Sequence, residues 1–273
     1  MANFNLRRAA TGLIVPMLAL VVWQTFSGMG WVNPLVLPSP LAVLRKWIEY
    51  VLPTTPYLPG AGSWVAWALS GELLRDTASS MIRVLVGFAV GAGLALPLGL
   101  TMGASVRVYT WMNPLVQVLR PIPPIAYIPL SILWFGLGNP PAIFLIAIGA
   151  FFPVLINTIA GVRNVDSIYL RAARNLGASQ ATLFLRVMLP AAVPYILSGV
   201  RIGIGTAFIV VIVAEMIAVN NGLGFRILEA REYFWSDKII AGMISIGLLG
   251  LAIDLAVTRL NNHLLRWHRG LEN

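Results

Sequence analysis

Charged side chains inside long apolar runs are the first candidates for chemistry in this chain of 273 residues. Arg120 and Arg201 stand near the middle of such runs, whereas Arg83 and Glu215 stand toward the ends of two runs. A charge in that setting is costly and marks a functional candidate. An anion that leaves water needs a compensating positive charge, and the planar fork of Arg fits an oxyanion. We therefore predict a path for a small anion along Arg120, Pro123, Arg201, Glu215 and Arg83.

Each of these charges also has a structural interpretation. Arg83 could pair with Glu215, and Arg120 could bind backbone carbonyls that the prolines after it leave without a donor. Asp254 is expected to pair locally with Arg259, about one helical turn away. The sequence leaves both interpretations open for Arg83, Glu215 and Arg120.

The residue types that perform catalysis or bind metals are not arranged for either purpose. The chain has no Cys, which excludes disulfides and thiolate metal sites. Its two His residues, His263 and His268, fall in a polar tail and are expected to face solvent. Neither Lys46 nor Lys238 follows a glycine-rich phosphate loop. We predict no catalytic residue, no metal site and no ATP site in this chain.

The composition indicates the environment that must hold these residues. Hydrophobic residues make up 58% of the chain and charged residues only 11%, and the mean hydropathy is +0.83. A soluble domain of this length could not bury so much apolar surface, whereas a bilayer accepts it. The net charge of +9 is scattered between apolar runs, as in membrane proteins that retain Lys and Arg on the cytoplasmic side. The lipid bilayer is therefore the expected partner, and nucleic acid is not.

Six apolar runs are long enough to be transmembrane helices, which need about 20 mainly apolar residues. The runs are roughly 10–29, 79–103, 110–136, 141–161, 190–218 and 239–259. We interpret the first as a transmembrane helix and not a signal peptide, because no small-x-small cleavage site follows it. The predicted fold is an all-α integral membrane protein with one transmembrane domain over residues 1–273.

Two of these runs carry a further signal. The second contains small residues at close spacing, which favours close packing of helices. These are Gly87, Gly91, Gly93, Gly99 and Gly103. The third holds Pro121, Pro123, Pro124 and Pro129, so it cannot be a regular helix throughout. Irregular backbone at membrane depth is tolerated where it lines a wet cavity, although a kinked packing helix is the alternative. Between the first two runs, residues 40–51 predict an interfacial helix.

The distribution of Lys and Arg predicts the orientation. Segments that would be cytoplasmic with the N-terminus inside are richer in Arg than the outer loops, as the positive-inside rule requires. Arg7, Arg8, Arg266 and Arg269 contribute to this bias at the two ends of the chain. Both termini and the loop 162–189, with Arg174, are therefore predicted to be cytoplasmic, and Pro56 and Asn221 are predicted to face outward.

The loop between the fourth and fifth runs predicts two short helices with a turn between them. Gly177 can adopt the left-handed conformation that ends the first helix, and Ser179 can cap the second. Small side chains make a surface of low relief that a partner's groove can accept, and two leucines could act as apolar anchors. The predicted partner-binding residues are Leu170, Arg171, Ala172, Ala173, Asn175, Leu176, Gly177 and Ala178.

This loop resembles the cytoplasmic signature of ABC importer permeases. That signature is Glu-Ala-Ala, three residues, Gly, nine residues, and Ile-x-Leu-Pro. The chain matches it, at the right spacing, at Ala172, Ala173, Gly177, Leu189 and Pro190. Val187 replaces the Ile, and Arg171 stands where the Glu is expected, so the salt bridge of that Glu does not carry over to this chain.

The resemblance extends over nearly the whole chain. Several further stretches are similar to the nitrate, sulfonate, taurine and bicarbonate group of these permeases. They are Leu37-Pro38-Ser39-Pro40, the stretch 120–130, Trp134-Phe135-Gly136, Ala214-Glu215-Met216 and Gly222-Leu223-Gly224. The resemblance implies a permease fold of the type I ABC importers, with six transmembrane helices and cytoplasmic termini in a bacterial inner membrane. It also implies that the loop 166–178 is the coupling helix.

The same resemblance implies the partners and the activity. These are a second permease copy, two cytoplasmic ATPase subunits that bind ATP and Mg²⁺, and an extracytoplasmic binding protein that delivers the substrate. The expected activity is import of taurine or another sulfonate, nitrate or bicarbonate by alternating access. An ATPase-independent secondary transporter or channel is the alternative. Such transporters often contain internal repeats, and the sequence shows none.

Overall fold

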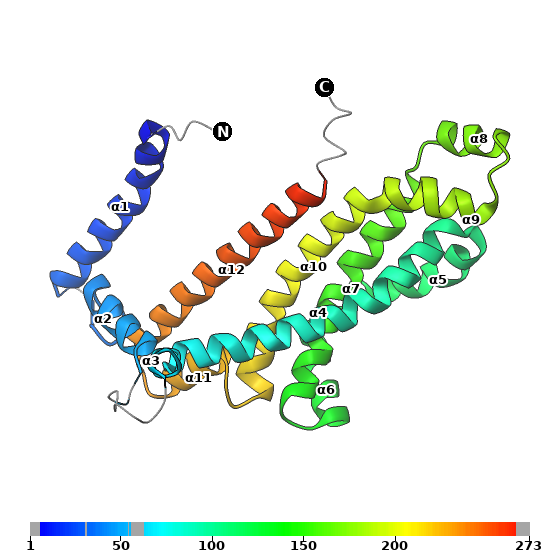
Figure 1. Cartoon of the computed structure of the whole chain (residues 1–273). Helices are drawn as coiled ribbons and strands as arrows, with labels where there is room; N and C mark the ends of the chain where they lie inside the picture. Colours follow the sequence, from blue (N-terminus) through cyan, green and yellow to red (C-terminus); the bar gives the residue numbers. More distant parts are fainter. Residues whose placement is uncertain (1–5, 31, 54, 56–62, 266–273) are drawn as a thin grey trace. The chain divides into compact units, whose positions relative to one another are not determined.

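The computed structural model describes residues 6–30, 32–53, 55 and 63–265, with the backbone alone at residues 6–13 and 65–66. Within this part of the chain the structure is helical and contains no strand (Figure 1). The side chains of Arg7 and Arg8, together with Pro56, Arg266, His268 and Arg269, lie outside the described residues. The chain divides into two compact units, which are described separately below. Unit 1 is Met1–Thr77 with Arg226–Gly247, and unit 2 is Ala78–Phe225 with Leu248–Asn273.

The helices have the following bounds. They are α1 Leu6–Gly28, α2 Pro40–Val51, α3 Trp64–Ala68, α4 Glu72–Ala104, α5 Val106–Leu119, the 3-10 helix η1 Pro124–Tyr127, α6 Ile128–Phe135, α7 Asn139–Arg163, α8 Ser167–Asn175, α9 Gln180–Leu183, the π-helix η2 Phe184–Met188, α10 Leu189–Ala218, α11 Leu223–Glu232 and α12 Ser236–Leu264.

The predicted number of membrane spans is confirmed in part. Among the described residues, α4, α7, α12 and the continuous stretch Gln180–Ala218 are each long and apolar enough to cross a bilayer, and α5 with η1 and α6 makes a fifth if that bent pair is one span. Where the side chains of α1 are described, its apolar part is Ile14–Gly28, which is shorter than a full span, so the sixth span stays a prediction. Helix α4 begins at Glu72, before the run predicted at 79–103, because apolarity marks the membrane and not the end of a helix.

Helix α7 lies at the centre of unit 2 and is the most buried of the long helices. Both of its sides meet neighbouring helices at glycines. A Cβ on Gly199 or Gly203 of α10 would stand 2.7 Å from Asn157 or 3.0 Å from Val154, both on α7. Such small residues let two helix backbones approach closely, which is how helices associate in lipid.

The predicted glycine face of α4 packs against another face of α7. A Cβ on Gly91 would lie 2.3 Å from the carbonyl oxygen of Ala147, and one on Gly87, Gly99 or Gly103 would also collide with α7. Gly93 has nothing within 4 Å of its Cβ position and is not part of this face. The prediction of close packing is therefore confirmed at four of the five glycines.

The third apolar run is interrupted, as its prolines predict, but the interruption is larger than a kink. Helix α5 ends at Leu119, and the segment Pro124–Phe135 leaves at an angle of 82°. Pro123 is extended, with φ −65° and ψ 141°, and Pro121 lacks the N–H that would continue the helix. Residues 110–136 are therefore two helices joined by an irregular segment and not one straight span.

Unit 1 contains the predicted interfacial helix. The Ser39 hydroxyl accepts a hydrogen bond from the Ala42 N–H at 3.2 Å, and Pro40 occupies the first turn of α2, where its missing N–H costs nothing. Trp47 of α2 donates to Ser245 of α12 at 2.8 Å. The predicted range 40–51 is confirmed.

Candidate functional site

Helix α8 is a short helix whose two ends are fixed by local hydrogen bonds. The Asp166 carboxylate accepts from the Ile168 N–H at 2.8 Å and caps the N-terminus. At the other end, Gly177 has φ +79°. The Gly177 N–H donates to the Arg174 carbonyl at 2.9 Å, and the Ala178 N–H donates to the Ala173 carbonyl at 3.0 Å. This pair of bonds is the Schellman motif, so the predicted turn at Gly177 is confirmed.

The motif brings one signature residue, Ala173, close to Ala178, the residue after the signature Gly177. Ala173 and Ala178 stand at the positions whose side chains commonly touch in a Schellman motif, and both are half-buried. Ser179 then caps α9 by accepting from the Thr182 N–H at 3.2 Å. The sequence from residue 166 to residue 182 therefore builds a rigid helix–turn–helix by itself.

The outer face of α8 is apolar and exposed. Leu176 is 89% exposed, and Ile168 and Tyr169 are also exposed, whereas Leu170 is half-buried against the chain. Helix α8 contacts α9 and the π-helix and stands at one end of α10 (Figure 1). Such a protruding apolar set on a rigid helix has the form of a docking surface for a protein partner.

The end of the signature coincides with the π-helix. Pro190 has no N–H to donate to the carbonyl of Arg186, four residues earlier, and the Leu189 N–H instead donates to the Phe184 carbonyl, five residues earlier. This wider turn joins α9 to α10 without a break, and π-helical turns of this kind often occur at functional sites.

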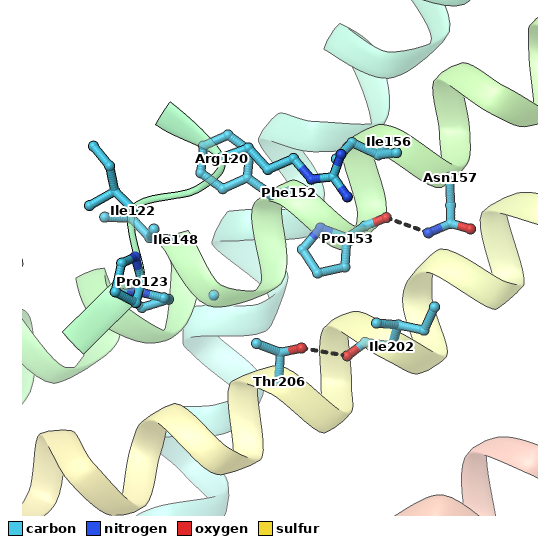
Figure 2. A pocket seen from close by; sticks show the side chains of 12 residues that line it. Arg120, Ile122, Pro123, Ile148, Phe152, Pro153, Ile156, Asn157, Ile202 and Thr206 are labelled. Atoms are coloured by element: carbon cyan, nitrogen blue, oxygen red, sulfur yellow. Dashed lines mark hydrogen bonds between the residues drawn. The ribbon is translucent and has the colours of Figure 1, made fainter. Parts of the chain in front are cut away.

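A cavity of about 350 Å³ lies in unit 2 beside the irregular segment after α5 (Figure 2). Its walls come from this segment, from α7 and from α10. The lining residues are Arg120, Ile122, Pro123, Pro124, Ile148, Gly149, Phe152, Pro153, Ile156, Asn157, Ile202 and Thr206. The volume is in the range of sites for small molecules. The cavity therefore brings together the two candidates Arg120 and Pro123 that the sequence singled out.

Arg120 is the charged group of this lining. It ends α5, and its side chain lies among those of Phe152, Pro153 and Ile156 (Figure 2). The Arg120 guanidinium has no hydrogen bond or ion pair to any described residue. It therefore does not bind the backbone carbonyls that the prolines leave without a donor, which was the structural interpretation. Its five N–H donors are therefore available to a ligand.

The other two polar side chains of the cavity are partly occupied. The Asn157 amide donates to the Pro153 carbonyl at 2.8 Å, and the Thr206 hydroxyl donates to the Ile202 carbonyl at 2.9 Å. Both bonds are visible in Figure 2. Asn157 and Thr206 were not predicted as site residues, since polar residues in a span give no signal of the cavity that they face.

Arg83 and Glu215 pair with each other, as the structural interpretation allowed. Their side chains are 5% and 0% exposed, and the distance from Arg83 Nη1 to Glu215 Oε1 is 2.6 Å. Glu215 also accepts from the Ser80 hydroxyl at 2.9 Å and from the Gly224 N–H at 3.0 Å. Neither Arg83 nor Glu215 lines the cavity beside Arg120.

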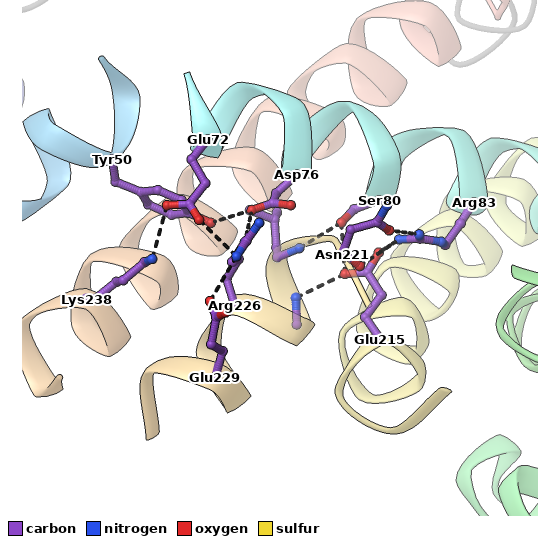
Figure 3. Close-up of polar contacts among 12 residues, drawn as sticks. Tyr50, Glu72, Asp76, Ser80, Arg83, Glu215, Asn221, Arg226, Glu229 and Lys238 are labelled. Atoms are coloured by element: carbon purple, nitrogen blue, oxygen red, sulfur yellow. Dashed lines mark hydrogen bonds and ion pairs between the residues drawn. The ribbon is translucent and has the colours of Figure 1, made fainter. Parts of the chain in front are cut away.

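The rest of the Arg83 guanidinium holds two loops. It donates to the Asn139 side chain at 2.7 Å and to the backbone and side-chain oxygens of Asn221 (Figure 3). Gly222 has φ +104°, and a Cβ there would lie 2.5 Å from the Glu215 carboxylate. This buried pair therefore joins α4, the start of α7 and the loop after α10, and explains why Gly222 stands beside it.

Arg201 is placed differently from the prediction. It makes two hydrogen bonds of 3.0 Å to the carboxylate of Asp254, so the expected local pair of Asp254 with Arg259 is wrong. Five residues on a helix span about 140° of rotation, rather than a shared face. Both partners are about half exposed, and Arg201 does not line the cavity.

Unit 1 contains a second charge cluster, which the sequence did not predict. Arg226 contacts Glu72 at 2.9 Å, Asp76 at 2.7 Å and Glu229 at 2.9 Å (Figure 3). The Tyr50 hydroxyl donates to Asp76 at 3.1 Å. Burial, with the negative charge of Asp76, raises the pKa of Tyr50 well above its ordinary value, so this phenol remains a donor.

Residues 95–269 match the family described as "Binding-protein-dependent transport system inner membrane component". The aliphatic sulfonates transport permease protein SsuC of Bacillus subtilis is 37% identical over 96% of this chain and 88% of its own. The taurine transport system permease protein TauC of Escherichia coli is 34% identical over 91% and 86%. The bicarbonate transport system permease protein CmpB of Synechococcus elongatus is 34% identical over 95% and 92%.

A solved structure supports the fold. A chain from the inward-facing MetNI methionine ABC transporter aligns with a TM-score of 0.63 and 18% identity, covering 71% of this chain and 97% of its own. At that identity the likeness shows the fold alone. The match over residues 95–269 and the relatives of 34–37% identity show that the chain belongs to the binding-protein-dependent transport system inner membrane components, the permease subunits of ABC transporters.

Proposed function

We propose that this chain is the permease subunit of an ABC importer that carries a small anion of the sulfonate, taurine, nitrate or bicarbonate class into the cytoplasm. The proposal rests mainly on one observation about α8. This rigid helix has an exposed apolar face and lies at the position of the permease signature. The sequence has no phosphate loop, so ATP hydrolysis belongs to a separate subunit. Two such subunits, with bound ATP and Mg²⁺, would dock on residues 166–178.

The other partners follow from the charges and from the family. A second copy of the permease completes the path, and an extracytoplasmic binding protein delivers the anion to the outer side of a bacterial inner membrane. The ion pair of Arg201 with Asp254 supports the presence of a second permease copy. It lies within two membrane-spanning helices and is half exposed, and charges at that depth need protein or water around them.

The cavity beside Arg120 supplies the path for the anion in this proposal. Arg120, its charged group, lies where the backbone departs from a regular helix, which is tolerated at membrane depth beside protein or water. Arg83 and Glu215 satisfy each other and serve as a structural connection between helices. Arg201 would face the same aqueous path or the second copy.

The test of ATPase docking uses two substitutions at one residue. Gly177→Val places a β-branched residue at φ +79°, where a non-glycine residue loses about 1–2 kcal/mol. Gly177→Asn is the matched control, because Asn tolerates the left-handed conformation. We expect Val to reduce co-purification of the ATPase subunit and ATP-driven anion uptake in proteoliposomes by tenfold or more, and Asn to preserve both.

A further substitution separates the effect of the turn at Gly177 on ATPase binding from the effect of the exposed apolar face of α8. Leu176→Asp keeps the turn and adds a charge to the exposed apolar face, so we expect it to weaken ATPase binding as strongly as Gly177→Val. Uptake that is independent of ATP, or full coupling in both Gly177→Val and Leu176→Asp, would contradict docking at α8 and favour a secondary transporter.

A further inference from the structure

The cavity beside Arg120 has an uneven distribution of polar and apolar groups. Among the described residues that line it, the polar side chains are those of Arg120, Asn157 and Thr206, and none is a carboxylate. The remaining lining is aliphatic, proline or phenylalanine, with a single glycine. Because Asn157 and Thr206 each donate a hydrogen to a backbone carbonyl, the guanidinium is the one group of this lining with all its donors free. The cavity therefore offers one anion-binding end and an apolar remainder.

Resting on the proposed function, we infer that this cavity is a selectivity site for alkanesulfonates without an amino group, and that it discriminates against both taurine and small inorganic anions. The guanidinium fork can donate two parallel hydrogen bonds to two of the three oxygens of a sulfonate. The alkyl tail then lies along Ile148, Phe152 and Ile202. Each buried methylene increases affinity about fourfold, which corresponds to about 0.8 kcal/mol.

Taurine presents the opposite chemistry at its far end. Its ammonium group would have to leave water, and the described lining contains no carboxylate to receive it. The side-chain acceptors in this lining are the neutral oxygens of Asn157 and Thr206. An unpaired charge in an apolar site is strongly unfavourable. Taurine and 1-propanesulfonate differ only in an ammonium group in place of a methyl group, so they form a matched pair of ligands.

We expect nitrate and bicarbonate to bind weakly in this cavity for a different reason. Both can accept hydrogen bonds from the guanidinium, but neither has an apolar part to cover the aliphatic wall. A cavity of about 350 Å³ would remain largely unfilled around them. These anions gain the charge-assisted bond alone, whereas an alkanesulfonate gains that bond and the burial of its tail.

The experiment measures anion binding to the permease in the absence of the extracytoplasmic binding protein, so that the selectivity of that protein does not affect the result. The purified permease is placed in lipid nanodiscs, with and without its ATPase subunit. Dissociation constants are measured by ligand-observed NMR for methane-, ethane-, 1-propane- and 1-butanesulfonate, taurine, nitrate and bicarbonate. We expect affinity to rise about fourfold per methylene, and taurine to bind at least tenfold more weakly than 1-propanesulfonate.

Variants of the lining residues test whether this cavity causes the preference for alkanesulfonates. Arg120→Gln should abolish binding of every anion, and Arg120→Lys should restore part of it, because Lys keeps the charge without the fork. Arg107→Gln is the matched control. Arg107 is an exposed Arg of α5 that does not line the cavity, so affinity should not change. Thr206→Asp places a carboxylate across the cavity from Arg120 (Figure 2) and should shift the preference tenfold or more toward taurine.

The outcomes separate this inference from the proposed function. Equal affinities for taurine and 1-propanesulfonate, no dependence on chain length, or no binding of any anion would each overturn the selectivity site. ATP-driven uptake by the complete transporter would still stand in those cases. Loss of the proposed function would instead appear as failure of the ATPase subunit to bind, with the binding preference in nanodiscs unaffected.

Discussion

At the scale of residues, the structure separates charges that hold the protein together from charges that are open to a ligand. Arg83 and Glu215 are buried and bind each other, and Glu215 also accepts hydrogen bonds from Ser80 and Gly224. Arg120 has no partner among the described residues. Both kinds of residue are Arg or Glu in an apolar run, so the residue type alone does not distinguish them.

The buried pair is predicted to act as a unit. Glu215→Gln keeps an acceptor for Ser80 and Gly224 but leaves the guanidinium of Arg83 buried without its counter-charge, which typically costs about 3–5 kcal/mol. We expect a marked fall in thermal stability in detergent and in membrane yield.

A double variant provides the control for this prediction. Arg83→Met combined with Glu215→Gln removes both charges and keeps the acceptor oxygen, so it should be more stable than Glu215→Gln alone. A double variant that melts no higher than the single one would show that the loss comes from something other than the uncompensated charge.

At the scale of elements, helix α7 is held by backbones that approach it closely from both sides. The contact between α4 and α7 depends on glycines whose Cβ positions are already occupied by the neighbouring helix. Lipid supplies no hydrophobic force between helices, so close van der Waals packing of this kind carries the association. The walls of the cavity on α7 therefore depend on packing at glycines some distance away.

Two neighbouring glycines of α4 test this statement. Gly91→Ala puts a methyl group 2.3 Å from the backbone oxygen of Ala147, and we expect a destabilisation of about 1–3 kcal/mol, the usual cost of overpacking. Gly93→Ala meets nothing within 4 Å and improves helix propensity by up to about 1 kcal/mol. Melting temperatures of the two variants in the same detergent give the comparison, and equal values would contradict the packing role of Gly91.

At the scale of the whole molecule, the length of the longest helical stretch determines how far α8 stands from the membrane. The stretch Gln180–Ala218 has 39 residues, which corresponds to about 58 Å at 1.5 Å per residue. The hydrocarbon core is only about 30 Å thick. The stretch must therefore project from the bilayer, and α8 is attached at one end and the loop with Asn221 at the other.

This geometry predicts opposite accessibility for two residues. Since the chain has no Cys, Arg174→Cys and Asn220→Cys can be labelled singly. Both positions are exposed, and Asn220 avoids disturbing Asn221, which binds Arg83. A membrane-impermeant maleimide added to intact cells should label residue 220 and reach residue 174 only after permeabilisation. Labelling of residue 174 from outside would reverse the proposed orientation and place α8 away from any cytoplasmic ATPase.

The sequence by itself determined the features that depend on near neighbours in the chain. The apolar runs follow from composition over about 20 residues, because lipid accepts them wherever they occur. The turn at Gly177, the cap at Ser179 and the break at Pro121 and Pro123 are backbone effects over a few residues. The turn, the cap and the break are confirmed. The apolar runs are confirmed in part as membrane spans among the described residues, and helix ends such as Glu72 extend beyond them.

Only the tertiary structure decided which distant groups meet. Arg83 and Glu215 are separated by 132 residues, so their pairing could be suggested but not chosen. Asp254 was assigned to the wrong partner, and the cluster around Arg226 was missed, because each depends on how separate helices lie against one another. The cavity beside Arg120 has the same origin. Its walls come from three helical segments, and sequence spacing within one helix says nothing of the distance to another.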